Sequence, residues 1–283
     1  MAWLIAKASG GTVALRIEDL DKQRSKPEFA DQIMRDYEML GLFWDGGPTY
    51  QADHSERYEQ ALQKLSADGS VYPCVCTRAE QAAARAPHVG EVSAFRDPCE
   101  HRSASEIDDL VKGGREVALR LRIPHTKVSF EDQIQGPQTG NPAEEFGNVV
   151  LKRKDGAYAY QLAVVLDDAN SNVTSVVRGS DLLSSTYIQR YLQNLLGLEA
   201  PLYAHVPLLV NDQGKRLSKR DRDADIATLL ATYQSPERII GHLAYLAGLI
   251  PIDEGVSPED LLASLDTDAI IERLKDKESI VWR

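Results

Sequence analysis

The sequence predicts an α/β fold with a parallel sheet, a cysteine-containing insertion and a C-terminal helical segment. The first observation is the short apolar run TVALRIED at residues 12–19, which ends in acid and is typical of a strand buried on both faces. The second is that two segments with helical periodicity, 25–42 and 55–69, follow it. Strand and helices in this order favour an α/β domain, in which ligands bind at the carboxyl ends of the strands.

Each of the two helices is defined by its end residues and by one apolar face. Pro27 stands near the start of the first helix and Gly41 at its end, and Gly69 ends the second. The apolar faces are predicted to point into the core. They consist of Phe29, Ile33, Met34, Tyr37 and Leu40 in the first helix, and of Tyr58, Leu62 and Leu65 in the second.

The composition changes between about Val71 and Pro142, where we expect an insertion. The alternation of apolar residues and arginines over 117–123 predicts a half-exposed strand with Arg120 and Arg122 pointing outward.

The second half of the chain returns to alternating strands and helices. Residues 149–168 are interpreted as two strands around an Asp155-Gly156 turn. Residues 180–198 are predicted to form an amphipathic helix, and YAHVPLLV at 203–210 a strand. Four parts are therefore expected: a first half of the core at 1–70, the insertion at 71–142, a second half of the core at 143–233 and a helical segment at 234–283.

Composition indicates a soluble globular protein of the reducing cytosol. Apolar runs such as LAVVL at 162–166 are far shorter than the roughly 20 residues of a membrane span, and MAWLIAK at the start lacks the features of a signal peptide. Three cysteines, an odd number, argue against a disulfide framework. The formal net charge of −11 opposes non-specific binding of nucleic acid, so a nucleic-acid partner must meet a local basic surface.

The run GKRLSKRDRD at 214–223 places basic residues around one serine in this acidic chain. Taken alone it is interpreted as a solvated loop, because short motifs match by chance. A lysine-rich loop after a strand also suits a polyphosphate, since its ammonium groups can stabilise the negative charge that develops on a leaving pyrophosphate.

Four motifs in the expected order resemble class I aminoacyl-tRNA synthetases of the glutamyl-tRNA synthetase group. RLSKR at 216–220 is similar to the KMSKS signature, with three substitutions, and LRIEDLDKQR at 15–24 resembles the RIEDTD segment. The stretches at 158–168 and 176–198 resemble one further segment of the group, and YAHVPLL at 203–209 resembles another. The resemblance implies a Rossmann-like catalytic core and a ligase.

Within this group the chain resembles a short branch, the glutamyl-queuosine tRNA(Asp) synthetases, since it ends at ESIVWR without a helical anticodon-binding domain. The resemblance implies activation of glutamate by ATP to glutamyl-adenylate without tRNA, and transfer to queuosine of tRNA(Asp). Two alternatives are a truncated glutamyl-tRNA synthetase that charges tRNA(Glu) and a non-catalytic homologue that binds glutamate or tRNA. We expect a cytoplasmic monomer.

The resemblance also implies the residues of the site. A carboxylate accepts hydrogen bonds from an α-ammonium group, and an arginine fork together with a phenol suits a side-chain carboxylate. Structural alternatives are a salt bridge to Arg16 for the carboxylate, and a surface arginine and a core tyrosine for the pair. Mg²⁺ is expected with the nucleotide. The implied residues are Glu18, Tyr160 and Arg178 for glutamate, and Lys219, Arg216 and Ser218 for ATP.

Cys74, Cys76 and Cys99 form a Cys-x-Cys pair with a distant third cysteine. Thiolates hold zinc in closed tetrahedral sites, so we expect zinc at these three cysteines, although they leave the fourth position open. The branch resembled here has a tyrosine where this chain has Phe95, which cannot be a ligand. The alternatives are that His101 or His88 substitutes, that zinc is held weakly, or that the cysteines are buried and reduced.

None of the six histidines lies in an H-x-G-H setting, so we expect the first strand and HIGH motif of the resembled group to be missing. MAWLIAKASGG reads as the middle of a helix without a cap. Two explanations compete: Met1 is an internal methionine of a longer gene, or the chain is a degenerate homologue. We expect poor catalysis from the chain as it stands.

Overall fold

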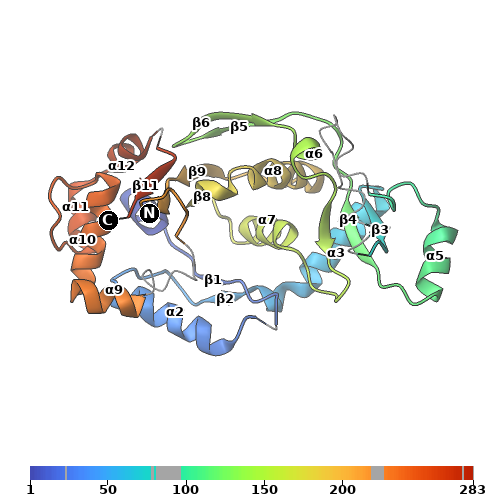
Figure 1. The fold of residues 1–283 in the computed structure, drawn as a ribbon, viewed down its shortest axis with the longest axis horizontal. Coiled ribbons are helices and arrows are strands. Elements are labelled where there is room, and N and C mark those ends of the chain that lie inside the picture. Colours follow the sequence, from blue (N-terminus) through green and yellow to red (C-terminus); the bar gives the residue numbers. More distant parts are fainter. Residues whose placement is uncertain (23, 78–79, 81–96, 218–225, 276, 283) are drawn as a thin grey trace.

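The computed structural model describes residues 1–22, 24–77, 80, 97–217, 226–275 and 277–282. Figure 1 shows an elongated molecule whose helices α7 and α8 lie in the middle, with the C-terminal helices at one end and the insertion with α5 at the other. The order of strands and helices, with parallel pairing in the central sheet, confirms the predicted α/β class.

The N-terminal part consists of short elements. Helix α1 spans Ala2–Ala8, and strand β1 (Arg16–Ile17) pairs in parallel with β2 (Thr49–Tyr50). The strand predicted over 12–19 is therefore only two residues long, and it is half-buried rather than buried on both faces. Thr12 and Ala14 are exposed, so the apolar run does not enter a sheet interior.

Helix α2 (Pro27–Met39) has the predicted ends but not the predicted orientation. Pro27 is its first residue, and Gly41 follows it at φ +74°. The side chains expected in the core are largely exposed: Phe29 at 52%, Ile33 at 43% and Tyr37 at 40%. The prediction of a core-facing stripe there was wrong for these three residues, because within the helix only Ala30 is buried, but Leu40 at its end is 8% exposed and joins a core cluster as predicted.

Helix α3 (Ser55–Ala67), which follows the short 3-10 helix η1 (Gln51–His54), confirms the second prediction. Tyr58, Leu62 and Leu65 are fully buried and join the main core cluster. Gly69 lies just beyond at φ +72° and ends the helix as expected.

An antiparallel sheet in the order β3-β4-β7 joins two strands of the expected insertion, Val71–Cys74 and Ala118–Leu121, to Val149–Lys152, which follows it. Helix α5 (Ala104–Lys112) begins at a capping box of Ser103 and Glu106. The half-exposed strand predicted over 117–123 is wrong in one respect, because Arg120 is 5% exposed and forms an ion pair with Asp97. An arginine in an alternating pattern thus lies inside when a buried carboxylate pairs with it.

The second of the two strands predicted over 149–168 is reduced to a short return arm, in which Tyr158 forms an antiparallel bridge with Lys152 before a helix begins. Gly156 turns the chain at φ +85°, as expected for Asp155-Gly156, but α7 then spans Tyr160–Asn170. Every residue from Leu162 to Asp168 in α7 is buried. A helix buried on all sides has no polar face, so its sequence resembles a buried strand.

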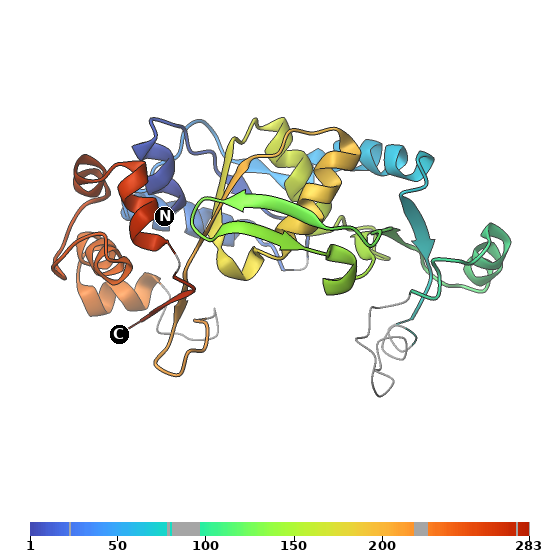
Figure 2. The same ribbon diagram turned by 90° about the horizontal axis from the view of Figure 1, so that it is seen from above.

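The central sheet has the order β6-β5-β9-β8. Strands β5 (Val128–Asp132), β9 (Leu202–Val206) and β8 (Ser175–Gly179) are parallel, and β6 (Gly136–Gly140) is antiparallel to β5. Figure 2 shows the β5–β6 ribbon extending across the molecule beside α8. Helix α6 spans Pro142–Glu145, η2 Ser180–Leu182 and α8 Ser185–Leu196, the last confirming the predicted amphipathic helix.

The strand predicted at 203–210 is present in two parts, β9 and β10 (Leu208–Val210), separated by Pro207. The C-terminal segment contains α9 (Ile226–Tyr233), α10 (Pro236–Ala247), α11 (Pro258–Ser264) and α12 (Thr267–Leu274). It is not purely helical, because β11 (Ser279–Val281) pairs in parallel with β10.

Two large clusters of buried side chains hold these elements together. One joins α3, α7 and α8, and the other joins α1 to α10, α11 and α12. An apolar cavity of about 390 Å³ lies within the second cluster, and its lining includes Trp3, Val177, Val206 and Ile240. In the described part of the chain, each helix is too short or too polar to cross a bilayer.

Candidate active site and metal centre

Arg178 and Tyr160 meet, as the sequence analysis expected. Arg178 lies in β8 and Tyr160 is the first residue of α7, and Nη1 of the arginine is 3.3 Å from the tyrosine hydroxyl. Arg178 Nη2 donates to Thr186 Oγ1 at 2.8 Å and to the Leu182 carbonyl at 3.3 Å. The guanidinium also lies over the Tyr203 ring, 5.5 Å from its centre. Both side chains are half-buried, so the pair combines a fixed charge with access from outside.

Glu18 follows β1 directly, and its side chain contacts Arg16 rather than Arg178 or Tyr160. Its Oε1 is 3.6 Å from Arg16 Nη2, which is the salt bridge considered as the structural alternative. The stronger partner of Arg16 is Asp168 of α7, with Nη1 and Oδ1 2.6 Å apart. Burial raises the pKa of Asp168 despite the neighbouring Arg16. The Glu18 carboxylate is exposed and its contact with Arg16 is long, so it can still accept bonds from a ligand.

The neighbouring Asp167 connects α7 to η1 and α3. Its side chain is 1% exposed and accepts from Gln51 Nε2 at 3.0 Å, His54 Nδ1 at 2.9 Å, Arg57 Nη1 at 3.0 Å and the Tyr58 hydroxyl at 2.6 Å. These four contacts satisfy a buried carboxylate and hold the two helices in register. Sequence reasoning missed this group, because its four donors lie together at 51–58 but the carboxylate they share, Asp167, comes more than 100 residues later in the chain.

The basic run at 214–223 begins close to β8, the strand that contains Arg178. Arg216 forms an ion pair with Asp181, three residues after Arg178, and the Leu217 amide donates to the Leu209 carbonyl at 3.0 Å. The structure therefore brings Arg216 near the end of β8. Lys219 and Ser218, the other two residues assigned to ATP, lie outside the described residues.

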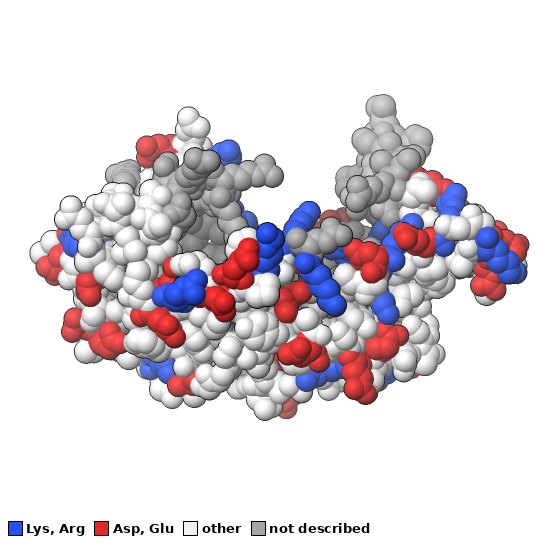
Figure 3. Space-filling view, turned by 90° about the horizontal axis from the view of Figure 1, so that it is seen from below, with Lys and Arg blue, Asp and Glu red and all other residues white. Residues whose placement is uncertain are grey.

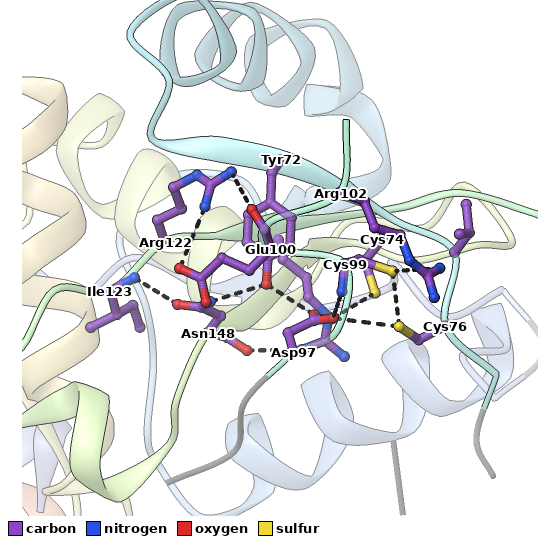
Figure 4. A network of polar contacts seen from close by, with 12 residues as sticks. Tyr72, Cys74, Cys76, Asp97, Cys99, Glu100, Arg102, Arg122, Ile123 and Asn148 are labelled. Carbon is purple, nitrogen blue, oxygen red and sulfur yellow. Dashed lines mark hydrogen bonds and ion pairs between the residues drawn. The ribbon is translucent and has the colours of Figure 1, made fainter. Parts of the chain in front are cut away.

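The three cysteines form a buried cluster together with Asp97. Figure 4 shows the three sulfur atoms and the Asp97 carboxylate turned toward one another, and one ligand atom from each lies within 4.8 Å of the others. Asp97 Oδ1 is 3.6 Å from Cys74 Sγ and 3.4 Å from Cys76 Sγ, and it accepts from the Cys99 amide at 2.9 Å. All three cysteines are free thiols.

The other oxygen of Asp97 is held from the opposite side. Its Oδ2 is 2.9 Å from both the Tyr72 hydroxyl and Arg120 Nε. Burial alone would raise the pKa of Asp97, but the Cys99 amide, the Tyr72 hydroxyl and Arg120 outweigh it, so the pKa is lowered. Burial raises the pKa of the Cys74 and Cys76 thiols. Asp97 is therefore ionised beside the protonated Cys74 and Cys76 thiols in the metal-free protein.

Two of three distances between ligand atoms in the cluster fit a zinc ion, and the third fits after a small separation of two sulfur atoms. With Zn–S of about 2.3 Å and Zn–O of about 2.0 Å, a tetrahedral site has S···O edges of about 3.5 Å and S···S edges of about 3.8 Å. The two measured S···O distances, 3.6 and 3.4 Å, match. Cys76 Sγ and Cys99 Sγ are closer, at 2.9 Å, and must separate by about 0.9 Å to admit the ion.

The fourth member of the cluster is not one of the residues considered from the sequence. His101 is exposed and does not belong to the group, while His88 and Phe95 lie outside the described residues. Asp97 was missed, although the sequence D-P-C at 97–99 was available as a signal. A carboxylate two residues before a cysteine can bond that cysteine's amide and still face its thiol.

The fold and site agree with a known family. Residues 1–249 match the profile of the catalytic domain of class I tRNA synthetases (E and Q). The chain belongs to this family.

Relatives within the class I synthetases extend the agreement. The chain is 43% identical over 277 residues to the glutamyl-Q tRNA(Asp) synthetase of Symbiobacterium thermophilum, covering 94% of this chain and 85% of the relative. It is 42% identical over 277 residues to the protein of the same name from Nitratidesulfovibrio vulgaris, covering 94% of this chain and 86% of the relative. Both confirm the expected resemblance to the glutamyl-queuosine branch.

Solved structures of class I synthetases share the fold. A glutamate-tRNA synthetase from Elizabethkingia anophelis superposes with a TM-score of 0.80 at 24% identity and covers 99% of this chain. A glutamate tRNA ligase from Elizabethkingia meningosepticum, solved in complex with its amino acid, gives 0.79 at 25% identity and also covers 99%. The chain spans 63% and 62% of the lengths of these two proteins.

Proposed function

We propose that this chain uses ATP to activate glutamate as glutamyl-adenylate and then transfers the glutamyl group to queuosine in tRNA(Asp). The observation that carries the proposal is the Arg178–Tyr160 pair, 3.3 Å apart at the end of a parallel strand, in a chain 43% identical to a glutamyl-Q tRNA(Asp) synthetase. Ligands of open α/β sheets bind at such strand ends.

Glutamate recognition is assigned to three residues. Arg178 and Tyr160 bind the side-chain carboxylate, and Glu18 holds the α-ammonium group. An uncharged glutamine side chain would lose the ionic partner of Arg178 and leave that guanidinium poorly satisfied, which disfavours glutamine.

ATP is assigned to the loop that begins at β10. Arg216 lies at its described start, and Lys219 and Ser218 follow as the residues that contact phosphate. The glutamate α-carboxylate attacks the α-phosphorus, the bond from that phosphorus to pyrophosphate breaks, and the cationic loop stabilises the leaving charge. Mg²⁺ is expected to accompany the nucleotide. When ATP binds, its phosphates compete with Asp181 for Arg216.

The Cys74, Cys76, Cys99 and Asp97 cluster is assigned to a structural zinc ion. With four donors the site is closed, so it is expected to stabilise the insertion rather than to take part in the chemistry. The test is metal content after purification with and without chelator. We expect about one zinc per chain, much less in Asp97→Asn, and no loss in the control Asp109→Asn, whose side chain is 78% exposed.

The tRNA partner is assigned to a local surface. Figure 3 shows Lys and Arg side chains gathered near the middle of one face, beside a hollow, with Asp and Glu among and around them. Such a surface can bind phosphates even though the whole chain carries a net charge of −11. The four-part division, the monomeric state and the cytoplasmic location remain predictions.

The test is glutamate-dependent ATP–pyrophosphate exchange without tRNA, followed by glutamylation of tRNA(Asp) with and without queuosine. Because poor catalysis is expected from the chain as it stands, exchange should be weak in the unaltered chain, disappear in Lys219→Ala and decrease further in Arg178→Lys. The control Arg24→Lys, whose side chain is 89% exposed, should not change it. Exchange that requires tRNA, or transfer to tRNA(Glu) instead of queuosine-containing tRNA(Asp), would contradict the proposal. Glutamate binding without any exchange would indicate a non-catalytic homologue.

A further inference from the structure

Three neighbouring strands of the central sheet present a row of polar side chains that the proposed chemistry does not use directly. Arg178 of β8 and His205 of β9 are directly paired in the parallel register, and Asp132 ends β5 on the other side of β9. His205 and Asp132 have fully buried side chains. His205 contacts Arg178 at Nε, whereas Tyr160 contacts it at Nη1.

The contacts in this row fix where each proton lies. His205 Nδ1 is 2.6 Å from Asp132 Oδ2, and His205 Nε2 is 3.1 Å from Arg178 Nε. An arginine Nε–H can only donate, so Nε2 must accept, and the ring proton must be on Nδ1. Burial alone would raise the pKa of Asp132, but bonds from the His205 ring and from backbone amides outweigh it and lower the pKa. The carboxylate is therefore ionised and accepts from Nδ1.

We propose that the Asp132–His205 pair is a positioning device for glutamate recognition: it holds His205 as the neutral Nδ1–H tautomer, whose Nε2 fixes the orientation of the Arg178 guanidinium. The inference rests on the proposed function, since it deepens the role given to Arg178. Arg178 Nε is bound to His205 and Nη2 to Thr186. Any rotation of the guanidinium would break one of these hydrogen bonds, so its orientation is fixed. Its Nη1 edge then faces Tyr160, where the substrate carboxylate is assigned. An arginine held in this way loses less side-chain entropy when it binds a carboxylate.

The backbone around Asp132 supplies a specific test. Asp132 Oδ1 accepts from the amides of Ile134 at 3.1 Å, Gln135 at 2.9 Å and His205 at 3.1 Å. In Asp132→Asn the carbonyl oxygen must occupy this position, because an amide nitrogen cannot accept. The NH₂ group then faces His205 Nδ1 and forces that nitrogen to accept. The ring proton moves to Nε2, where it opposes the Arg178 Nε–H and faces Thr186 Oγ1, 3.3 Å away, which in the unaltered chain can donate to that nitrogen.

The experiment combines two readouts on the full chain. Long-range ¹H–¹⁵N NMR reports the His205 tautomer, with His205→Gln used to assign its signals. Calorimetric titration with glutamate, and the KM values for glutamate and ATP in pyrophosphate exchange, report the effect on the site. The matched control is Glu131→Gln, an exposed carboxylate one residue earlier in the same strand.

We expect the Nδ1–H tautomer in the unaltered chain and the Nε2–H tautomer in Asp132→Asn. Glutamate affinity should fall by about 10-fold to 100-fold in Asp132→Asn, as for loss of one hydrogen bond to a charged group, while the KM for ATP stays the same. Glu131→Gln should match the unaltered chain in both readouts.

Two results would overturn the inference even if the chain binds glutamate normally. One is an Nε2–H tautomer or a protonated ring at His205 in the unaltered chain. The other is a tautomer change in Asp132→Asn without loss of glutamate affinity. If the unaltered chain shows the Nδ1–H tautomer but binds no glutamate, the proposed function is contradicted. The positioning role, which depends on that function, is then contradicted as well.

Discussion

Replacing Tyr58 by phenylalanine tests the buried group around Asp167. The Tyr58 hydroxyl lies 2.6 Å from an Asp167 carboxylate that is 1% exposed, and burial beside this charge raises the pKa of the phenol, so it stays a donor. Phenylalanine keeps the fully buried ring in place and creates no large cavity. Gln51, His54 and Arg57 continue to donate, so the carboxylate is not left without partners.

The expected cost is that of one hydrogen bond to a charged group, about 2 kcal/mol of unfolding free energy. At about 2–4 °C per kcal/mol for chains of 150–250 residues, the melting temperature should fall by roughly 4–8 °C. Urea unfolding should show a lower midpoint with an unchanged m-value, because the surface exposed on unfolding is the same.

Tyr158→Phe is the matched control, since its ring lies edge-on to Tyr58 with centres 5.1 Å apart. Its hydroxyl bonds Glu59 Oε2 at 2.9 Å, but the Glu59 side chain is 41% exposed, so the loss should stay below about 1 kcal/mol. Equal losses in the two variants would refute the argument that burial of Asp167 gives the bond its strength.

Three further predictions concern single buried contacts. Gly241→Ala should destabilise by about 3 kcal/mol in urea unfolding despite better helix propensity, because a Cβ there would overlap the Glu254 carbonyl oxygen; an unchanged midpoint would contradict this. Arg120→Met leaves Asp97 buried without its counter-ion and should cost about 3–5 kcal/mol in metal-free protein, with a smaller loss when zinc is added. Asp132 has a folded-state pKa below its unfolded value of about 3.9, so its stabilisation is present above that pH and is lost as the pH falls through the folded pKa. Asp132→Asn should therefore lower stability at neutral pH and flatten its fall in acid, as measured by urea unfolding at pH 7 and pH 3; a parallel shift at both pH values would be inconsistent with this linkage.

The sequence predicted the ends of helices better than their orientation. Pro27 and Gly41 bound α2 as expected, because their backbone preferences are local. Which face of α2 is buried depends on what packs against it, and Phe29 on the predicted face is 52% exposed. Helix α7 was predicted as a strand for a related reason. A segment that is buried on all sides has no pattern of polar and apolar residues that distinguishes a helix from a strand.

The site residues that could be predicted are those that lie in segments resembling the family's motifs. Arg178 and Tyr160 were named from a resemblance, and their side chains meet. Asp97 and His205 were not named, because most of the partners of Asp97 and the carboxylate partner of His205 are distant in the sequence, and the one local signal, D-P-C at 97–99, was overlooked. Asp97 faces thiols up to 23 residues away, and His205 bonds a carboxylate 73 residues earlier. Such pairings depend on strand order, which short motifs do not encode.

The pairing of β11 with β10 gives the protein a built-in optical probe. Trp282 follows β11, its amide donates to the Val210 carbonyl at 2.7 Å, and its ring lies 5.1 Å from that of His242. Val210 is also the last residue of the strand from which the basic loop starts. A displacement of that strand end when nucleotide binds would change the surroundings of the indole. Trp282 fluorescence would then follow ATP binding without any label, and a Trp282→Phe variant would identify its share of the signal.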